Sequence, residues 1–336
     1  MAKLLALVTG ACGFVGSHFI DQLLQHTNYS VRAMDLPEAD CQFLNRKVEF
    51  VPGDLRNSKT LARAVEDVNV VFHVASLFRY SASYDDLYAV NVEGTRNLCH
   101  EMIAAHVSKF VLISSAGVYG IPQSLPVTEQ ALPNPSNAYE QSKLEQEQAA
   151  QKICAKSDVK FVILRPAPIY GPRNRYGIGT ILRMVALGQL PIISKNLNTL
   201  VPLVHVADVV GAALHLVSDP TAVGQVYNVV DDSTYRKYEL FTYLAPLLDA
   251  KIYYTRFPLL PRWLLNALAS WSEWKARHFT HKEPKIERAT IDLMYHDYWY
   301  SNAKLKGTGY QLLYPDSRIG LEEIIEWYKQ SNWLVR

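Results

Sequence analysis

Three side chains, Ser115, Tyr139 and Lys143, are of types that can move a proton to or from a hydroxyl group. Tyr139 and Lys143 are four residues apart in a helical segment, so they share one face of that helix. A free phenol, with a pKa of about 10, is a poor base at neutral pH, but a nearby ammonium favours the phenolate. Ser115 follows an expected strand and could hydrogen-bond the reacting oxygen. The set indicates general base catalysis on an alcohol that loses hydride to a cofactor. The alternative to a catalytic pair is that Tyr139 and Lys143 are ordinary surface residues of a helix, because a tyrosine and a lysine four positions apart are common by chance.

A glycine-rich turn near the N-terminus predicts where that cofactor binds. An apolar run over 4–8 leads into Gly10, Gly13 and Gly16, and an apolar-periodic segment starts at Phe14. In a strand, turn and helix of this kind, the first glycine permits the sharp turn and the second leaves room for a pyrophosphate. The third glycine lets the helix pack closely on the strand, and the amino end of the helix faces the phosphates. The alternative is a glycine turn with no ligand.

Asp35 ends the next apolar run, about twenty residues after the turn, as the dinucleotide-binding pattern requires. A carboxylate there accepts hydrogen bonds from the adenosine ribose hydroxyls and repels a 2′-phosphate, so we expect NAD rather than NADP. The alternative is an acid that caps a loop. Asp54, in a Gly-Asp-Leu sequence after a later strand, either forms a simple turn or reaches the adenine amino group.

The remaining pattern predicts a fold that positions these residues. Strands are expected over 47–51, 68–74, 110–114, 161–164 and 225–230, and helices over 61–65, 83–106 and 136–155. Alternating strands and helices predict an α/β fold, a Rossmann-type doubly wound parallel sheet that binds ligands at the carboxyl ends of its strands. We expect residues 1–172, with 203–230 returning to them, to form the NAD-binding domain. Residues 173–202 and 231–336 are expected to form a smaller, mostly helical substrate-binding subdomain, with helices over 180–187, 238–248, 261–277 and 321–330.

Composition excludes several classes of function. The net charge of the 336 residues is +2, which does not indicate a nucleic-acid partner, and no run is long enough to span a bilayer. The four cysteines, Cys12, Cys41, Cys99 and Cys154, are scattered without metal-binding spacing. They are therefore expected to be reduced thiols, and the protein to be cytoplasmic without a bound metal.

The segment 257–278 is apolar, rich in tryptophan and bordered by basic residues. The simplest interpretation is a core helix of the C-terminal subdomain. The alternatives are a lid over an apolar substrate and a helix that rests on a membrane surface, which would make the protein membrane-associated.

These motifs together resemble the extended short-chain dehydrogenases/reductases of the NAD-dependent epimerase/dehydratase superfamily. The motifs occur in family order over 9–16, 53–55, 73–75, 91–98, 114–115, 139–143, 164–172 and 204–209. The resemblance implies that Tyr139 is the base, Lys143 the ribose ligand that also lowers the phenol pKa, and Ser115 the oxygen binder. It implies a structural or water-relay role for Asn91, and structural roles for His205 and Asp208. The cofactor-binding residues that it implies are Gly10, Cys12, Gly13, Phe14, Val15, Gly16, Asp35, Leu36, Asp54, Leu55, Val74, Ala75, Ser76, Asn91, Ile113, Ser114, Tyr139, Lys143, Pro166 and Ile169.

Two departures bear on the substrate class. Relatives that act on nucleotide sugars usually carry an asparagine where this chain has Pro168, and an arginine just before the Val-His-Val segment, where this chain has 198–203 with no cation. Basic residues elsewhere, Arg173, Arg175, Arg183 and Lys195, could still hold a diphosphate. The segment 164–171 is similar to the 3β-hydroxysteroid dehydrogenase branch. The expected substrate-side residues are Leu77, Phe78, Ser115, Ala116, Gly117, Pro168 and Arg173.

The resulting prediction is an NAD-dependent oxidoreductase that acts on a hydrophobic secondary alcohol or ketone, steroid- or sterol-like. The alternatives are a nucleotide-sugar epimerase or dehydratase with tightly bound NAD, and a non-catalytic NAD-binding module. By analogy with similar enzymes, the helices over 83–106 and 136–155 predict a homodimer.

Overall fold

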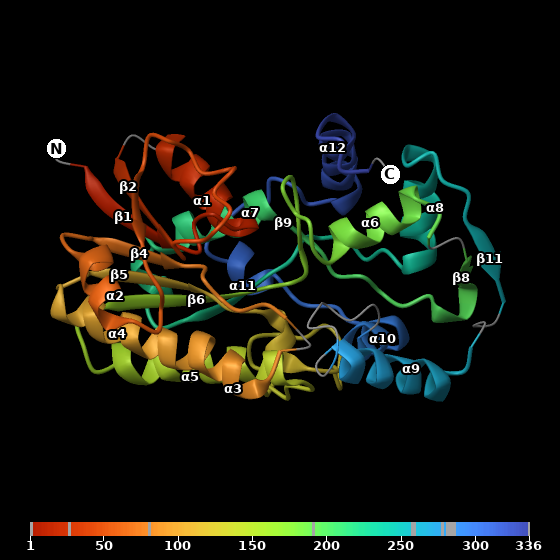
Figure 1. Cartoon of the computed structure of the whole chain (residues 1–336), viewed down its shortest axis with the longest axis horizontal. Coiled ribbons are helices and arrows are strands. Elements are labelled where there is room, and N and C mark those ends of the chain that lie inside the picture. The colour runs from red at the N-terminus through yellow and green to blue at the C-terminus, as the bar shows by residue number, and fades with distance from the viewer. Residues whose placement is uncertain are drawn as a thin grey trace.

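A seven-stranded parallel sheet forms the centre of the N-terminal part of the molecule (Figure 1). The computed structural model describes residues 3–25, 28–79, 82–189, 192–256, 260–276, 279 and 287–334. The strand order is β10-β6-β5-β4-β1-β2-β3, and every neighbouring pair is parallel. The strands are β1 (Leu4–Thr9), β2 (Tyr29–Asp35), β3 (Glu49–Pro52), β4 (Val70–His73), β5 (Lys109–Ile113), β6 (Lys160–Pro166) and β10 (Val226–Val229). The predicted α/β class is confirmed.

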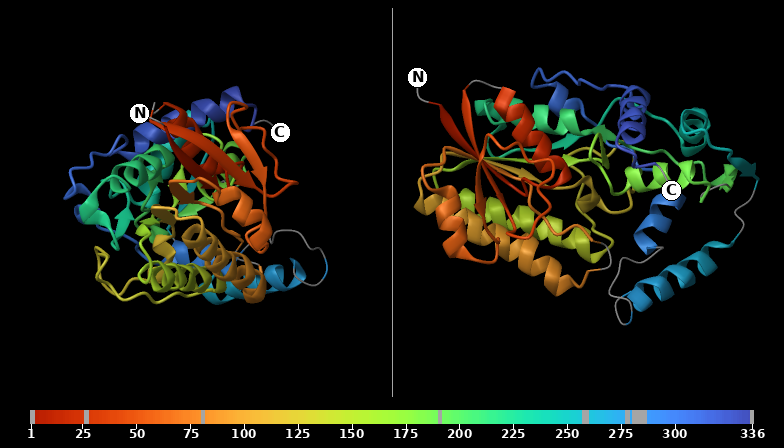
Figure 2. Two further views of the ribbon diagram at one scale, coloured as in Figure 1. Left: turned by 90° about the vertical axis from the view of Figure 1, so that its left-hand side faces the viewer. Right: turned by 45° about the horizontal axis from the view of Figure 1, so that its top comes forward.

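Helices cover both faces of this sheet (Figures 1 and 2). One face packs against α1 (Phe14–Gln25) and α7 (Val206–Leu216), and α11 (Ala303–Lys306) contacts β10. The other face packs against α2 (Ser58–Val65), α4 (Gly94–Ala104) and α5 (Ala138–Cys154). Successive side chains of a strand point to opposite faces, so Ala6 and Val8 join the first core and Leu7 joins the second. The buried apolar runs of the sequence therefore become a sheet that is covered on both sides.

The helix predicted over 83–106 is not continuous. It consists of α3 (Tyr84–Leu87), a π-helical segment η1 (Tyr88–Glu93) and α4. A further short element, the 3₁₀ helix η2 (Ala116–Tyr119), follows β5. Both elements lie next to the residues expected to do chemistry, where local departures from regular helix are frequent.

The C-terminal part has its own core. Apolar side chains of α6 (Ile178–Ala186), α8 (Lys237–Leu247) and α12 (Ser317–Gln330) pack together. Two small parallel sheets, β7 (Ile169–Tyr170) with β9 (Val204–His205) and β8 (Ile192–Ser194) with β11 (Tyr253–Thr255), were not predicted. The helices α9 (Arg262–Lys275) and α10 (Arg288–Tyr295) pack on each other at one end of the molecule.

The interpretation of the tryptophan-rich segment as a core helix is wrong. Helix α9 occupies most of that segment, while 257–259 and 277–278 lie outside the described residues. Ala269 is the one buried residue of α9, and its tryptophans are exposed. The periodic apolar positions of this helix therefore do not face a core. Within the described residues, no helix combines the length and the apolar character needed to cross a bilayer.

Asp208, in the first turn of α7, connects the C-terminal segment to the sheet layer. Its carboxylate accepts hydrogen bonds from the Tyr310 hydroxyl (3.1 Å) and from the backbone amides of Leu313 (2.7 Å) and Tyr314 (2.9 Å). His205 caps the same helix, because its Nδ1 accepts from the Ala207 amide at 3.2 Å. The structure thus gives both residues the structural roles expected of them.

Candidate active site

The glycine turn after β1 forms a cradle for an anion. Gly10 has a φ of +69°, and a Cβ there would lie 2.8 Å from the Ala75 Cα, so only glycine fits. At Gly16 a Cβ would collide with the Gly10 carbonyl group, which explains the close packing of α1 on β1. The backbone amides of Phe14, Val15 and Gly16 have no acceptor among the described residues. Three free donors at the positive end of a helix fit the pyrophosphate of a dinucleotide.

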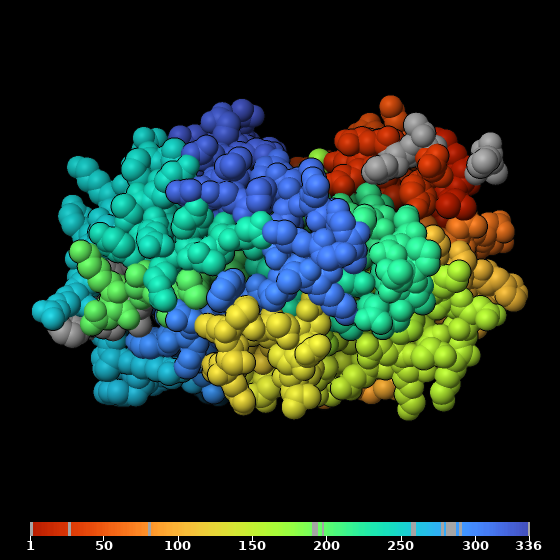
Figure 3. All heavy atoms as spheres, turned by 180° about the vertical axis from the view of Figure 1, so that it is seen from behind, coloured from red at the N-terminus to blue at the C-terminus, as the bar shows by residue number. Residues whose placement is uncertain are grey.

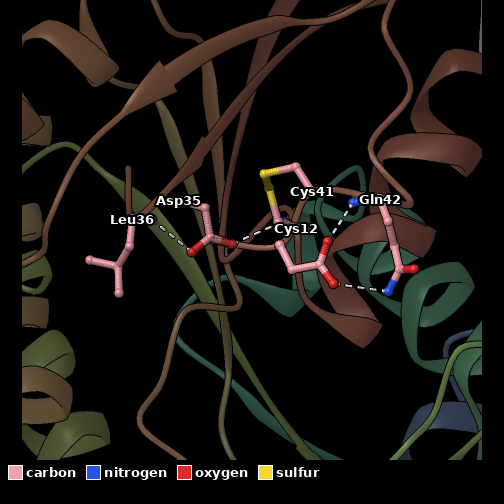
Figure 4. Close-up of a disulfide and its surroundings, with 6 residues drawn as sticks. Cys12, Asp35, Leu36, Cys41 and Gln42 are labelled. Atoms are coloured by element: carbon pink, nitrogen blue, oxygen red, sulfur yellow. Dashed lines mark hydrogen bonds between the residues drawn. A yellow bond between two sulfur atoms is a disulfide. The ribbon is translucent and has the colours of Figure 1, made fainter. Parts of the chain in front are cut away.

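Asp35 stands beside this cradle, at the end of β2. Its carboxylate accepts from the Cys12 amide at 2.9 Å and from the Leu36 amide at 2.8 Å (Figure 4). Burial raises the pKa of Asp35, and these two hydrogen bonds act in the opposite direction. The carboxylate is thus fixed next to the glycine turn, where an adenosine ribose would lie.

Asp54 has a nearer partner than a nucleotide. Its carboxylate accepts from Nε (3.0 Å) and Nη2 (2.6 Å) of Arg56, and also from the Arg56 amide. The Arg56 guanidinium lowers the pKa of Asp54 by hydrogen bonding. Of the two interpretations of this residue, the geometry supports the simple turn. Its neighbour Leu55 packs under Gly94 at the start of α4.

Cys12 and Cys41 form a disulfide that was not predicted (Figure 4). The expectation of four reduced thiols is therefore wrong for this pair, while Cys99 and Cys154 are free and buried. The two bonded residues are 29 positions apart in the sequence, but their Cα atoms are 4.6 Å apart because the loop after β2 folds back onto the glycine turn. The bond thus joins the glycine turn to the segment that follows Asp35.

The three chemically reactive side chains come together beyond the carboxyl end of β5. Ser115 caps η2, accepting a 3.0 Å hydrogen bond from the Gly117 amide, and its side chain also hydrogen-bonds the Tyr139 phenol. Tyr139 and Lys143 lie in the first turns of α5, which Asn137 caps by accepting from the Glu140 amide. The Lys143 Nζ donates to the carbonyl of Ile113, the last residue of β5, at 2.9 Å. Sequence spacing therefore predicted a real spatial cluster.

The electrostatics of this cluster differ from the expectation. Burial raises the pKa of Tyr139, the Glu140 charge raises it further, and the Ser115 hydrogen bond lowers it. Burial also lowers the pKa of Lys143 to about 7, with Glu147 acting in the opposite direction. The predicted lowering of the phenol pKa by Lys143 is not seen, because the ammonium group is directed at Ile113. The protein alone therefore keeps Tyr139 protonated, and the phenolate requires another positive charge close by.

Asn91 occupies a structural position in η1. Its Oδ1 accepts from the Leu77 amide (2.7 Å) and the Ser76 hydroxyl (3.0 Å), and its Nδ2 donates to Ser142 Oγ (3.0 Å). Both ends of the amide are thus occupied by protein groups, which supports the structural role over the water relay. Asn91 ties the segment after β4 to α5, the helix that carries Tyr139.

A buried polar network behind the cluster was not predicted. His73 Nδ1 lies 2.7 Å from Thr9 Oγ1, and its Nε2 lies 2.9 Å from Thr95 Oγ1. Gln146 of α5 donates to the same Thr95 hydroxyl at 2.8 Å. Burial lowers the pKa of His73 to about 3, so the ring is neutral. A histidine and a threonine inside otherwise apolar strands were the only sequence signal for this network.

The other expected cofactor and substrate residues lie along the strand ends. The ring of Phe78 stands edge-on to the Tyr139 ring at 4.9 Å, and Pro168 is exposed. Arg173, which was expected on the substrate side, forms an ion pair inside the protein: its Nη2 lies 2.7 Å from the Asp21 carboxylate of α1. The remaining residues are Val74, Ala75 and Ser76 after β4, Ser114 after β5, Ala116 and Gly117 in η2, Pro166 at the end of β6 and Ile169 in β7.

Comparison with known proteins adds independent information. The NAD dependent epimerase/dehydratase family matches residues 6–229. A sterol-4-alpha-carboxylate 3-dehydrogenase (decarboxylating) of Mus musculus is 30% identical over 270 residues, which cover 78% of this chain and 73% of the relative. A 3-beta-hydroxysteroid dehydrogenase of Mycolicibacterium neoaurum is 26% identical over 337 residues, covering 96% of this chain and 90% of the relative.

Solved structures share the whole fold. A UDP-glucose 4-epimerase of Thermotoga maritima, solved with UDP-glucose, superposes with a TM-score of 0.79 over 98% of this chain and 100% of its own, at 22% identity. MoeE5, solved with UDP-glucuronic acid and NAD, has a TM-score of 0.75 at 25% identity and covers 97% of this chain and 99% of its own. The first of these likenesses is evidence for the fold alone.

Proposed function

The chain belongs to the NAD-dependent epimerase/dehydratase family, and we propose that it is an NAD-dependent oxidoreductase of a hydrophobic secondary alcohol or ketone, sterol- or steroid-like. The observation that carries the proposal is the cluster of Ser115 with the buried Tyr139 and Lys143 at the carboxyl end of β5. Mere binding of a dinucleotide requires no phenol and no buried ammonium, so the cluster argues against a non-catalytic binding module.

The cofactor proposed here is NAD, held by the cradle at 10–16 and by Asp35. The free amides of that cradle would take the pyrophosphate, and the Asp35 carboxylate would take the ribose hydroxyls. A 2′-phosphate would meet a carboxylate, which is why NAD is proposed over NADP. When bound, NAD accepts hydride from the carbinol carbon of an alcohol, and its oxidised nicotinamide supplies positive charge beside the phenol.

In the proposed reaction the chain itself holds the substrate oxygen and takes its proton. The Ser115 hydroxyl would orient the oxygen, and Tyr139 would accept the hydroxyl proton as the phenolate, once the positive charge of the oxidised nicotinamide offsets the burial that raises its pKa. The Lys143 Nζ, which donates to the Ile113 carbonyl at 2.9 Å, would also bind a ribose hydroxyl of the cofactor. In the reverse direction the phenol returns the proton to the ketone oxygen.

An apolar substrate is favoured because the cations that could hold a diphosphate already have protein partners. Arg173 pairs with Asp21, Arg175 and Arg183 stack on the Trp333 ring, and Lys195 lies over the Tyr238 ring. Arg236, bridged to Leu200 just before the Val-His-Val segment, pairs with Asp297 at 3.3 Å. Pro168 adds no side-chain donor. The substrate is proposed to bind between the NAD-binding domain and residues 173–202 and 231–336.

The test is turnover of a 3β-hydroxysteroid with NAD by the purified protein. We expect ketone and NADH in equal amounts. Tyr139→Phe should lower kcat/KM by about 100-fold or more, because the base is lost. Tyr253→Phe, which removes a hydroxyl from an exposed tyrosine of β11, is the matched control. No ketone with any 3β-hydroxysteroid, together with interconversion of UDP-sugars without release of NADH, would establish the epimerase alternative instead.

We also propose a homodimer in which α4 and α5 of two copies form a four-helix interface. The two helices pack side by side on one face of the sheet, as the analogy requires (Figure 1). Sedimentation velocity should give the mass of two 38.0 kDa chains, and a single-chain mass would contradict the proposal.

A further inference from the structure

Helix α9 presents three tryptophans to solvent on one side. Trp263, Trp271 and Trp274 are 71%, 58% and 50% exposed, and Leu268 is 38% exposed. With 3.6 residues per turn, the three tryptophans fall within an arc of roughly 80° around the helix axis. Ala269, the buried residue of α9, points to the opposite side. This exposed strip, formed by Trp263, Leu268, Trp271 and Trp274, is here called the tryptophan face.

The tryptophan face lies on the outside of the molecule. In the tilted view of Figure 2, α9 lies at the edge of the molecule away from the sheet, and in the view from behind its residues form a corner of the surface (Figure 3). A contiguous exposed patch of large apolar side chains usually marks a binding surface, because soluble proteins rarely leave such area in water. The charged residues around the tryptophan face indicate which kind of partner covers it.

The charge of the surrounding sequence identifies the partner. Residues 251–288 contain eight lysines and arginines and three glutamates in sequence, and those of them that the structure describes are five cations and two glutamates, a net charge of +3 in a chain whose total is only +2. Within α9, Lys275 lies over the Trp271 ring at 5.1 Å, so one cation sits directly on the tryptophan face. Tryptophan beside lysine and arginine is the composition of helices that lie in the headgroup region of a bilayer.

We propose that the tryptophan face of α9 docks on the surface of an anionic lipid bilayer. Acidic headgroups match the positive charge of 251–288, and the indole rings, apolar with one polar N–H, suit the boundary between headgroups and acyl chains. A second copy of the chain is a poorer occupant, since a twofold contact through α9 would oppose two segments whose described residues each carry a net charge of +3. The helix lies on the bilayer and does not cross it.

Helix α10 packs on α9 and approaches Glu140, the neighbour of Tyr139. Arg262 of α9 pairs with Asp292 of α10 at 3.0 Å. Burial raises the pKa of Glu140, the neighbour of Tyr139, and the Asp292 charge adds to this effect, so Asp292 of α10 lies near Glu140. If the proposed function holds, an apolar alcohol would reach the site from the bilayer in which it dissolves.

Flotation of the full-length protein with lipid vesicles tests the docking without any need for turnover. We expect binding to vesicles of phosphatidylcholine with about one quarter phosphatidylglycerol, weakening as salt is raised, and much less binding to phosphatidylcholine alone. The double variant Trp263→Ser/Trp271→Ser should bind at least about tenfold more weakly, because two interfacial side chains are lost.

The matched control is Leu132→Ser/Leu313→Ser, which removes two side chains that are 87% and 64% exposed elsewhere on the surface and should bind as the wild type does. Circular dichroism and the melting temperature verify that both variants fold. The proposal is overturned if the wild type does not float with anionic vesicles, or if the tryptophan variant floats equally well. It is also overturned if the tryptophan variant loses self-association in sedimentation rather than vesicle binding. Failure of the steroid assay with intact vesicle binding would affect the proposed function alone.

Discussion

The Cys12–Cys41 disulfide should contribute measurably to the stability of the protein. It closes a loop between residues 29 positions apart. In the chain-entropy treatment, a loop of about 30 residues restricts the unfolded chain enough to stabilise the folded state by about 3.6 kcal/mol at 25 °C. A chain of 336 residues unfolds with an entropy of about 0.7 kcal/mol/K. Loss of the disulfide is therefore expected to lower Tm by about 5 °C.

The perturbation is Cys41→Ser, chosen because Cys41 is half-buried in a loop, whereas the Cys12 amide also holds Asp35. Calorimetry of the wild type with and without a phosphine reductant, and of the variant under both conditions, measures the effect. The reductant should lower Tm of the wild type and leave that of Cys41→Ser unchanged. NAD should also bind more weakly after reduction, because the loop after β2 regains freedom that binding must then restrict.

Thiol titration in denaturant provides the decisive control. The untreated wild type should show two reactive thiols, from Cys99 and Cys154, and four after reduction. Four thiols without reductant, or a Tm that the reductant does not change, would refute the reasoning.

Three further predictions concern the cluster and the cofactor. Burial lowers the Lys143 pKa from 10.5 to about 7, so between these pH values the unfolded chain binds a proton that the folded chain does not. The free energy of unfolding should therefore rise by about 4 kcal/mol more in the wild type than in Lys143→Met between pH 7 and pH 10, as denaturant titration can measure; equal slopes would contradict this. Glu140→Gln removes a charge that raises the Tyr139 pKa, so the acid limb of kcat/KM should move to lower pH, and a limb that stays in place would exclude the coupling. Asp35→Ala should weaken NAD about tenfold and reduce the preference over NADP, measured as two dissociation constants; an unchanged ratio would show that Asp35 does not select the cofactor.

Local patterns predicted the sheet and the glycine turn well. The run over 4–8, its three glycines and the helix after them form a continuous unit, and no distant residue is needed to specify it. The order of Ser115, Tyr139 and Lys143 in the sequence was also sufficient to predict that they lie together. In this fold the end of the strand and the neighbouring helix meet at a fixed place.

Features that depend on long-range packing were missed. β7 and β9 are two residues each, too short for any periodicity, and exist because they pair with each other across 35 positions. The Cys12–Cys41 bond depends on the path of a loop that no spacing rule describes. Helix α9 has the apolar content of a core helix, and sequence periodicity cannot tell whether such a face meets a core, a partner or a bilayer. The pKa of Tyr139 depends on burial, which a motif does not express.

The three hydrogen bonds that Asp208 accepts have a consequence for how the protein can be divided. An excised Rossmann half ending near residue 230 would contain the Asp208 carboxyl but none of its donors from 310–314. A buried carboxyl group without hydrogen-bond donors lowers the free energy of unfolding by several kcal/mol, which is a large fraction of the stability of any domain. The part of the chain that forms the large sheet thus depends on residues 310–314 for some of its stability, and a truncation from the C-terminus would remove that support as well.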